Sequence, residues 1–200
     1  MSPQQMDNKQ KTENLEALIS KISFEIVNEE ILDETEINKL LGVLSSNGVY
    51  AMWVYALDKF GVKFSEDCQM LKEEKLFKLL SKIAELDKFI SKTINFEQLA
   101  IEMCNLTKGI NNLKQEIKGL NDEIKKLEKE KNRDELKRRK KELKRKVEDK
   151  KEKEKERNNK LIEYFINIAN DIHKLLFLKQ LLEKTLIYAR YHAKALQDGE

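Results

Sequence analysis

The feature that most constrains the fold is a long, unbroken repeat of apolar residues spaced alternately four and three positions apart. The repeat consists of Leu99, Met103, Leu106, Ile110, Leu113, Ile117, Leu120, Ile124 and Leu127. Because this spacing places every apolar side chain on one side of a helix, it is typical of a coiled coil. The sequence therefore predicts a long helical rod.

The same spacing resumes after a short break, first with apolar and then with charged residues. Its positions are Leu136, Leu143, Val147, Lys150, Glu154 and Arg157, and apolar residues return from Leu161 onward. The segment Lys131–Asp134 between the two stretches contains no apolar residue. We therefore predict a helical hairpin with antiparallel arms and a tip between Glu128 and Glu135. Counting back from the tip pairs Leu120 with Leu143 and places Leu113 opposite Lys150.

The flanking segments predict the fold class. Charged residues make up 38% of the chain, which has one Pro and six Gly, and no segment alternates with the period of two that a half-buried strand requires. We predict an all-α protein: a compact helical bundle from residues 12–105 and 161–200, with residues 106–160 inserted as an antiparallel coiled-coil hairpin. Residues 1–11 are polar and are expected to be disordered.

Local signals predict the helices of the bundle. Asp33 is a candidate N-cap, Ser45–Gly48 interrupts the helical pattern, and Gly61 follows a helix over Val49–Phe60. That helix should bury one face made by Val49, Trp53, Ala56, Leu57 and Phe60. A fourth helix is expected to begin at Ser65–Asp67 and to continue to Ile90, and Asn95 should cap the helix that enters the rod.

The chain is expected to be soluble and cytoplasmic. Its longest apolar run, Val49–Leu57, is much shorter than the roughly 18 residues that span a bilayer, and the polar N-terminus does not resemble a signal peptide. Cys68 and Cys104 have neither CxxC spacing nor a cluster of other ligands nearby, so both are expected to be buried or idle thiols.

Positive charge is concentrated in the predicted hairpin. Residues 125–160 hold 19 Lys or Arg and 10 Asp or Glu, a surplus of nine positive charges in a chain whose net charge is +3. The densest part consists of Lys137, Arg138, Arg139, Lys140, Lys141, Lys144, Arg145 and Lys146. Such a helix can bind phosphate backbones without sequence preference, because each neutralised phosphate releases counterions. A merely solvated charged helix and a nuclear-targeting segment remain alternatives. The run Lys150–Arg157 alternates in sign, and we assign it no partner.

No catalytic, metal or cofactor site is predicted. His173 and His192 lie on apolar helices without carboxylate or cysteine neighbours at ligand spacing, so we interpret them as core or rim histidines. The carboxylates are scattered, and no Gly-rich loop or serine elbow is present. A hydrolase or nuclease would lack an identifiable base or metal ligand.

The C-terminal helix carries a smaller basic site. Its apolar seam consists of Leu182, Leu186, Ala189, Ala193 and Leu196. Arg190 and Lys194 share another face, flanked by Tyr191, which could bind a phosphate or an acidic neighbour. Ordinary solvent-facing bases are the alternative.

Two segments resemble the small helical subunit of type III-B CRISPR RNA-guided effector complexes. Leu41–Leu57 has that family's pattern of an apolar helix, an Asn-Gly step and an Ala- and aromatic-rich helix. The aromatic and basic pattern ending in Ala193-Lys194-Ala195-Leu196 is similar to its closing helix. The charged hairpin departs from the compact family pattern, as does His192, where a bulky aromatic residue is more usual. The small subunits of type III-A and type I complexes are also helical and remain alternatives.

The resemblance implies a non-catalytic, structural subunit of an antiviral effector. It implies contacts with the backbone of guide or target RNA or DNA, for which Arg190 and Lys194 are the matching positions. It also implies stacking against other subunits of the complex, including further copies of this chain. The hairpin would then be an added arm for nucleic acid or for a subunit. The alternative is a coiled-coil scaffold that binds only protein partners.

Overall fold

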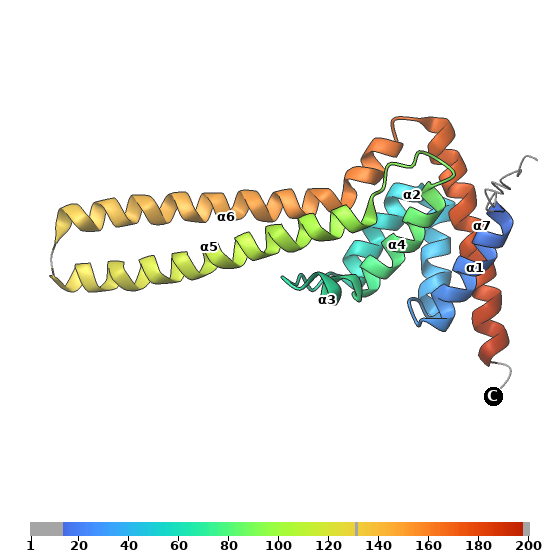
Figure 1. The fold of residues 1–200 in the computed structure, drawn as a ribbon, viewed down its shortest axis with the longest axis horizontal. Helices are drawn as coiled ribbons and strands as arrows, with labels where there is room; N and C mark the ends of the chain where they lie inside the picture. The colour runs from blue at the N-terminus through green and yellow to red at the C-terminus, as the bar shows by residue number, and fades with distance from the viewer. Residues whose placement is uncertain (1–13, 131, 198–200) are drawn as a thin grey trace, which may run out of the picture.

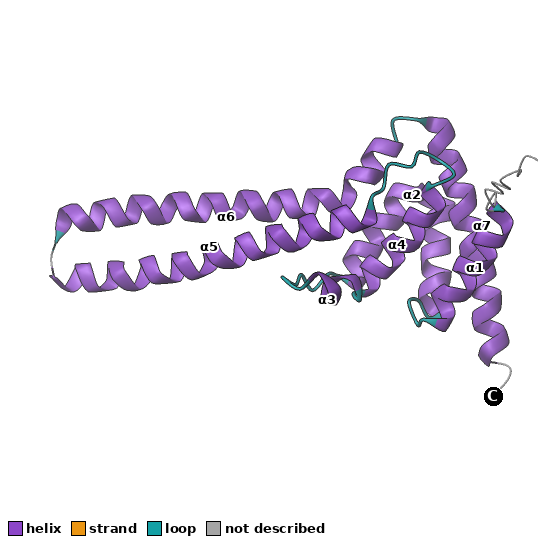
Figure 2. Cartoon of the chain, viewed as in Figure 1, coloured by secondary structure: helices purple, strands orange, loops and turns teal. Residues whose placement is uncertain are grey.

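The computed structural model describes residues 14–130 and 132–197, and the expectation of disorder for residues 1–11 lies outside them. The described residues form helices and no strand, so the predicted all-α fold class is confirmed (Figure 2). The helices are α1 (Leu15–Asn28), α2 (Glu34–Phe60), α3 (Cys68–Lys72), α4 (Lys75–Asp87), α5 (Phe96–Glu130), α6 (Arg133–Ile168) and α7 (Ile172–Gln197).

A bundle and a projecting hairpin make up the molecule (Figure 1). Helices α1, α2, α4 and α7 pack together, while α5 and α6 leave the bundle side by side as two antiparallel arms. The arms are joined at Lys131 and Asn132, within the predicted tip. The part of α6 from Leu161 onward returns to the bundle, so chain segments on both sides of the hairpin share one core.

The helix boundaries follow the expected capping chemistry. Asp33 caps α2 in a capping box: its carboxylate accepts from the Glu36 backbone N–H at 2.7 Å, and the Glu36 carboxylate accepts from the Asp33 N–H at 2.9 Å. Helix α2 is kinked at Gly48, which has φ 87° and ψ −177°, and it ends at Gly61, with φ 63°. Both φ values favour glycine, so the interruption and the stop predicted there are confirmed.

The single helix predicted from Ser65–Asp67 to Ile90 is wrong, because the chain forms the short helix α3 and then α4. Asp67 caps α3 as expected, but Glu74 is extended and turns the chain between the two helices. This turn lets Leu71 pack beside α5 in a second apolar cluster, while Leu76 packs in the main core. Local periodicity cannot reveal that the two leucines belong to different clusters.

Trp53 lies at the centre of the main core, fully buried as predicted. Its ring stacks on Phe165 of α6 with centroids 4.6 Å apart, and its Nε1–H donates to the Leu161 carbonyl oxygen at 2.6 Å. Val49 and Ala56 are buried on the same face, but Leu57 and Phe60 are only partly buried. Trp53 therefore fastens α2 to the segment of α6 that returns from the hairpin.

A buried carboxylate fixes the loop that leads into the hairpin. Asp87, 1% exposed, accepts hydrogen bonds from the backbone N–H groups of Thr93 and Ile94 at 2.7 and 3.1 Å. It also accepts from the hydroxyls of Ser91 and Tyr164. Burial, together with the neighbouring Asp87 charge, raises the pKa of Tyr164, so its hydroxyl stays a donor. The α4–α5 loop and α6 are thereby held at the root of the hairpin.

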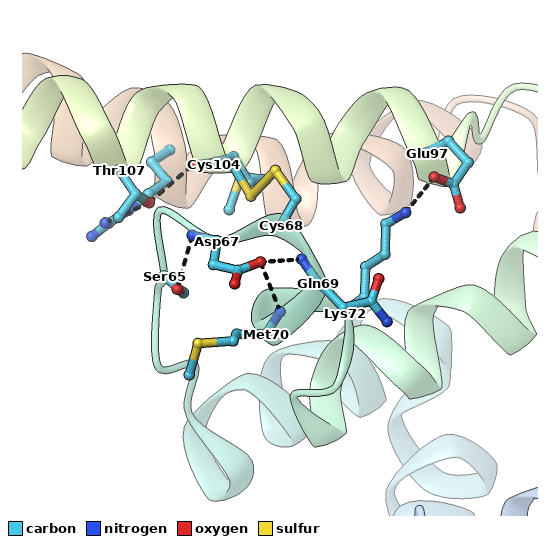
Figure 3. Close-up of a disulfide and its surroundings, with 11 residues drawn as sticks. Ser65, Asp67, Cys68, Gln69, Met70, Lys72, Glu97, Cys104 and Thr107 are labelled. Carbon is cyan, nitrogen blue, oxygen red and sulfur yellow. Dashed lines mark hydrogen bonds and ion pairs between the residues drawn. A yellow bond between two sulfur atoms is a disulfide. The ribbon is translucent and has the colours of Figure 1, made fainter.

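The two cysteines are paired, so the expectation of idle thiols is wrong. Cys68 at the start of α3 and Cys104 on α5 form a disulfide with Cα atoms 5.6 Å apart (Figure 3). The pairing depends on the turn after Gly61, which brings α3 against α5. Neither the cysteine spacing nor the local sequence indicates this contact. The bond joins the bundle to the first arm.

Removing this disulfide is expected to destabilise the protein. It encloses a sequence separation of 36 residues, for which the chain-entropy relation gives a loss of about 4 kcal/mol in the free energy of unfolding. We expect Cys104→Ser to show about 2 to 4 kcal/mol in urea titrations followed by helical circular dichroism. Reduced wild-type protein should show a similar loss. Two freely reactive thiols in the oxidised, folded protein would contradict the pairing.

Helix α2 is long and apolar enough, by length and composition, to cross a membrane. Core helices of soluble proteins pass the same test. Seven residues of α2 are buried against the rest of the bundle, and its kink at Gly48 lies within the apolar stretch. These are properties of a core helix.

Candidate nucleic-acid interface

The hairpin positions the predicted basic residues, and its polar contacts define the register of its arms. Lys160 contacts Glu102 at 2.7 Å, Arg157 contacts Thr107 at 3.3 Å, and Lys146 contacts Glu116 at 2.8 Å. Each contact joins residues whose numbers sum to nearly the same value, as antiparallel arms require. The register agrees with the pairing of Leu120 and Leu143 expected from the seam. Apolar residues of α5 face α6 along it: Ile110, Leu113, Leu120 and Ile124 are buried.

Three of the predicted binding residues instead link the two arms. Arg139 contacts Glu123 of α5 at 3.2 Å, Lys140 contacts Glu128 at 2.9 Å, and Lys146 contacts Glu116 at 2.8 Å. Arg139 also pairs with Glu135 and Glu142 on its own helix. The hydrogen bond to Glu142 is the largest of the contributions that raise the pKa of Arg139. We call Arg139, Lys140 and Lys146 the cross-arm bases; their charge is balanced by nearby carboxylates.

Four other predicted residues are exposed and unpaired. Within the described parts of the chain no ion pair involves the free bases, defined as Lys137, Lys141, Lys144 and Arg145. Arg138 has a side chain that is 82% exposed and lies 3.5 Å from Glu135, a weak surface pair. Three of the free bases line a shallow depression on α6 together with Arg138, Glu142 and Glu148. The structure thus separates the basic run into a structural set and a set available to a ligand.

Arg157, at the root of the hairpin, was not singled out by the sequence. Its guanidinium carbon lies 3.6 Å from the centroid of the Phe64 ring, and Nη1 donates to the Thr107 hydroxyl at 3.3 Å. Its Nε is buried without a hydrogen-bond partner among the described residues, and burial lowers the pKa of the group. The signal in the sequence is a cation in the phase of an apolar seam, which indicates a buried position but not the stacking partner.

Arg190 and Lys194 lie on α7, in the bundle, at the opposite end of the molecule from the hairpin tip (Figure 1). Arg190 lies 5.9 Å from the Tyr191 ring centroid, and the Lys194 Nζ is 4.0 Å from Glu34. Leu196 is 58% exposed, so its predicted place in the α7 seam is wrong, whereas Ala189 and Ala193 are buried as expected. The two predicted basic sites therefore form separate surfaces.

The histidines lie apart from any cluster of ligands. His173 is exposed near the start of α7, and His192 packs edge-on against Phe24 with ring centroids 5.9 Å apart. Among the described residues, no group of three or more His, Cys, Asp or Glu side chains is arranged to hold a metal ion. What the described surface offers is exposed positive charge on a rigid helix.

No family model, curated protein or solved structure matches the chain. The functional argument therefore depends on the geometry of this chain and on the resemblance described above.

Proposed function

We propose that the protein is a non-catalytic, structural, nucleic-acid-binding protein that holds an RNA or DNA backbone on the exposed surface of α6. The observation that carries this proposal is the set of free bases, which are exposed and have no carboxylate partner among the described residues. Free cations gain counterion-release energy on meeting phosphates, whereas the cross-arm bases would first have to break their ion pairs. Arg190 and, more weakly, Lys194 add a second, smaller contact surface.

The resemblance supports a particular setting for this activity. A small subunit of an RNA-guided antiviral effector contacts guide or target strands and packs against other subunits, without catalytic residues of its own. We propose this role, in the cytoplasm, for the present chain. Because the cytoplasm keeps most disulfides reduced, Cys68 and Cys104 would act there mainly as neighbouring thiols at the root of the hairpin.

A coiled-coil scaffold that binds only protein is the second candidate function. It is favoured by exposed apolar side chains on α7, where Ile172 is 57% exposed, Leu176 49% and Tyr191 61%. Such residues can form part of a protein interface. Docking of helices through apolar contacts depends little on ionic strength, whereas phosphate binding weakens steeply as salt is added.

Replacing free bases tests the proposal. We expect Lys137→Gln, Lys141→Gln and Lys144→Gln together to weaken binding to RNA and DNA oligonucleotides, similarly for all sequences. Three lost phosphate contacts should make the slope of log K against log salt shallower by roughly 2 to 3. Glutamine keeps the helix propensity of lysine, so the effect should be electrostatic. Fluorescence anisotropy across a salt series measures both quantities.

The matched control removes the same charge from the cross-arm bases. Arg139→Gln, Lys140→Gln and Lys146→Gln together should change the salt slope by less than about one, because these groups are already paired. Their main effect should be earlier melting of the hairpin. Equal losses from the two triple variants would show that only net charge matters. Undiminished binding by the first variant would contradict the proposed site and leave the protein scaffold as the better account.

A further inference from the structure

The exposed cations of α6 extend beyond the basic run and form one straight line along the helix. At about 100° per residue, six exposed bases fall within a sector of roughly 80°. We call them the cationic stripe: Arg133, Lys137, Lys141, Lys144, Lys151 and Lys155. Glu148 is the acidic residue that interrupts this sector. From Arg133 to Lys155 the stripe is about 33 Å long at 1.5 Å per residue.

The alternating charges of Lys150–Arg157, which carried no sequence prediction, are thus sorted by the helix. Lys151 and Lys155 are exposed and continue the stripe, and neither makes an ion pair within the described parts of the chain. By contrast, Lys150 pairs with Glu154 at 3.3 Å. Lys153 is half-buried, and its chain covers Gly109 of the opposite arm. The stripe therefore includes part of the segment that seemed to be a neutral linker.

The hairpin has positive charge but nothing on which to stack a base. No Phe, Trp, Tyr or His occurs between Glu97 and Glu163. Proteins that bind single strands usually combine a basic groove with aromatic side chains on which successive bases stack. A straight cationic line without aromatic residues can contact only the phosphate backbone.

We infer that the cationic stripe binds double-helical nucleic acid, lengthwise, through its phosphates; this inference rests on the proposed function. A duplex carries one phosphate per about 1.7 Å of its axis, twice the linear density of one strand, and releases more counterions per contact. It is also stiff, so a straight stripe of about 33 Å meets a line of phosphates over about ten base pairs without first straightening the ligand. Its bases remain paired, so the missing aromatic residues cost nothing.

Comparing a 20-base-pair duplex with its separate strands tests this inference. In DNA and RNA forms with the same fluorescent label, we expect the full-length protein to bind the duplex about fivefold or more tightly at moderate salt. The slope of log K against log salt should also be steeper for the duplex. Equal or tighter binding of the single strands would overturn the inference while leaving the proposed function intact. Absence of binding to any of these ligands would overturn both.

A second comparison tests whether Lys151 and Lys155 belong to the site. Replacing both with Gln should make the duplex salt slope shallower by about 2 and weaken binding several-fold. The matched control is Lys150→Gln with Lys153→Gln, which removes the same charge from the same turns but outside the stripe. That control should change the slope by less than about one. If the two pairs have equal effects, the lengthwise contact along the stripe is wrong.

Discussion

Trp53→Ala is expected to lower the free energy of unfolding by about 3 to 5 kcal/mol, the range for large aromatic residues removed from a core. The side chain is fully buried, and the loss combines a cavity with two specific contacts. Stacking on Phe165 disappears, and the Leu161 carbonyl loses the indole N–H that it accepts at 2.6 Å. Because both partners lie on the returning part of α6, the variant should loosen the attachment of the hairpin to the bundle. Urea denaturation followed by circular dichroism measures the change.

Two other variants serve as controls for this effect. Trp53→Phe keeps an aromatic ring against Phe165 but removes the N–H donor, so we expect an intermediate loss of about 1 to 2 kcal/mol. Tyr191→Ala removes an aromatic side chain that is 61% exposed, and it should change stability by less than about 0.5 kcal/mol. A loss below about 1 kcal/mol for Trp53→Ala would show that α2 does not pack on α6 as described.

Deleting the hairpin is expected to abolish tight nucleic-acid binding and leave the bundle folded. Residues 110–155 would be replaced by four Gly or Ser residues. Gly109 lies against Lys153 of the other arm, and packed helices are about 8 to 10 Å apart. Four extended residues reach about 13 Å, which is enough to join the cut ends. The contacts of Trp53, Asp87 and Cys104 all lie in the part that is kept.

The deletion variant should still unfold cooperatively in heat and denaturant, with a helical signal reduced by the removed residues. Binding to oligonucleotides should fall to the weak level that Arg190 and Lys194 can support. A variant that loses the helical signal of the bundle would show that the hairpin is required for folding and is not an insertion. A stable bundle that retains full binding would instead place the nucleic-acid site on α7 or elsewhere in the bundle.

Much of the candidate site could be predicted from the sequence, but its internal division could not. The run from Lys137 to Lys146 is evident from composition. Whether each base is free depends on which carboxylates lie opposite it, and Glu116, Glu123 and Glu128 are on the other arm. An error of one or two residues in the register would exchange paired and free positions. The partial burial of Arg157 against Phe64 likewise depends on a loop distant in sequence.

The sequence by itself determined the features that depend on neighbouring residues. The seam spacing defined the rod, the apolar gap at Lys131–Asp134 defined its tip, and Asp33, Gly48 and Gly61 marked a start, a kink and a stop. These signals act within a few turns of helix, because periodicity and capping are local properties. The fold class followed from them.

Only the tertiary structure decided which distant groups meet. The disulfide between Cys68 and Cys104, the division of Leu71 and Leu76 between two clusters, and the four hydrogen bonds to Asp87 join segments that local pattern does not relate. Each depends on how the turns after Gly61 and Asp87 direct the chain. The physical reason is that helix formation is governed by local periodicity, whereas contacts between helices are chosen by the burial of a shared core.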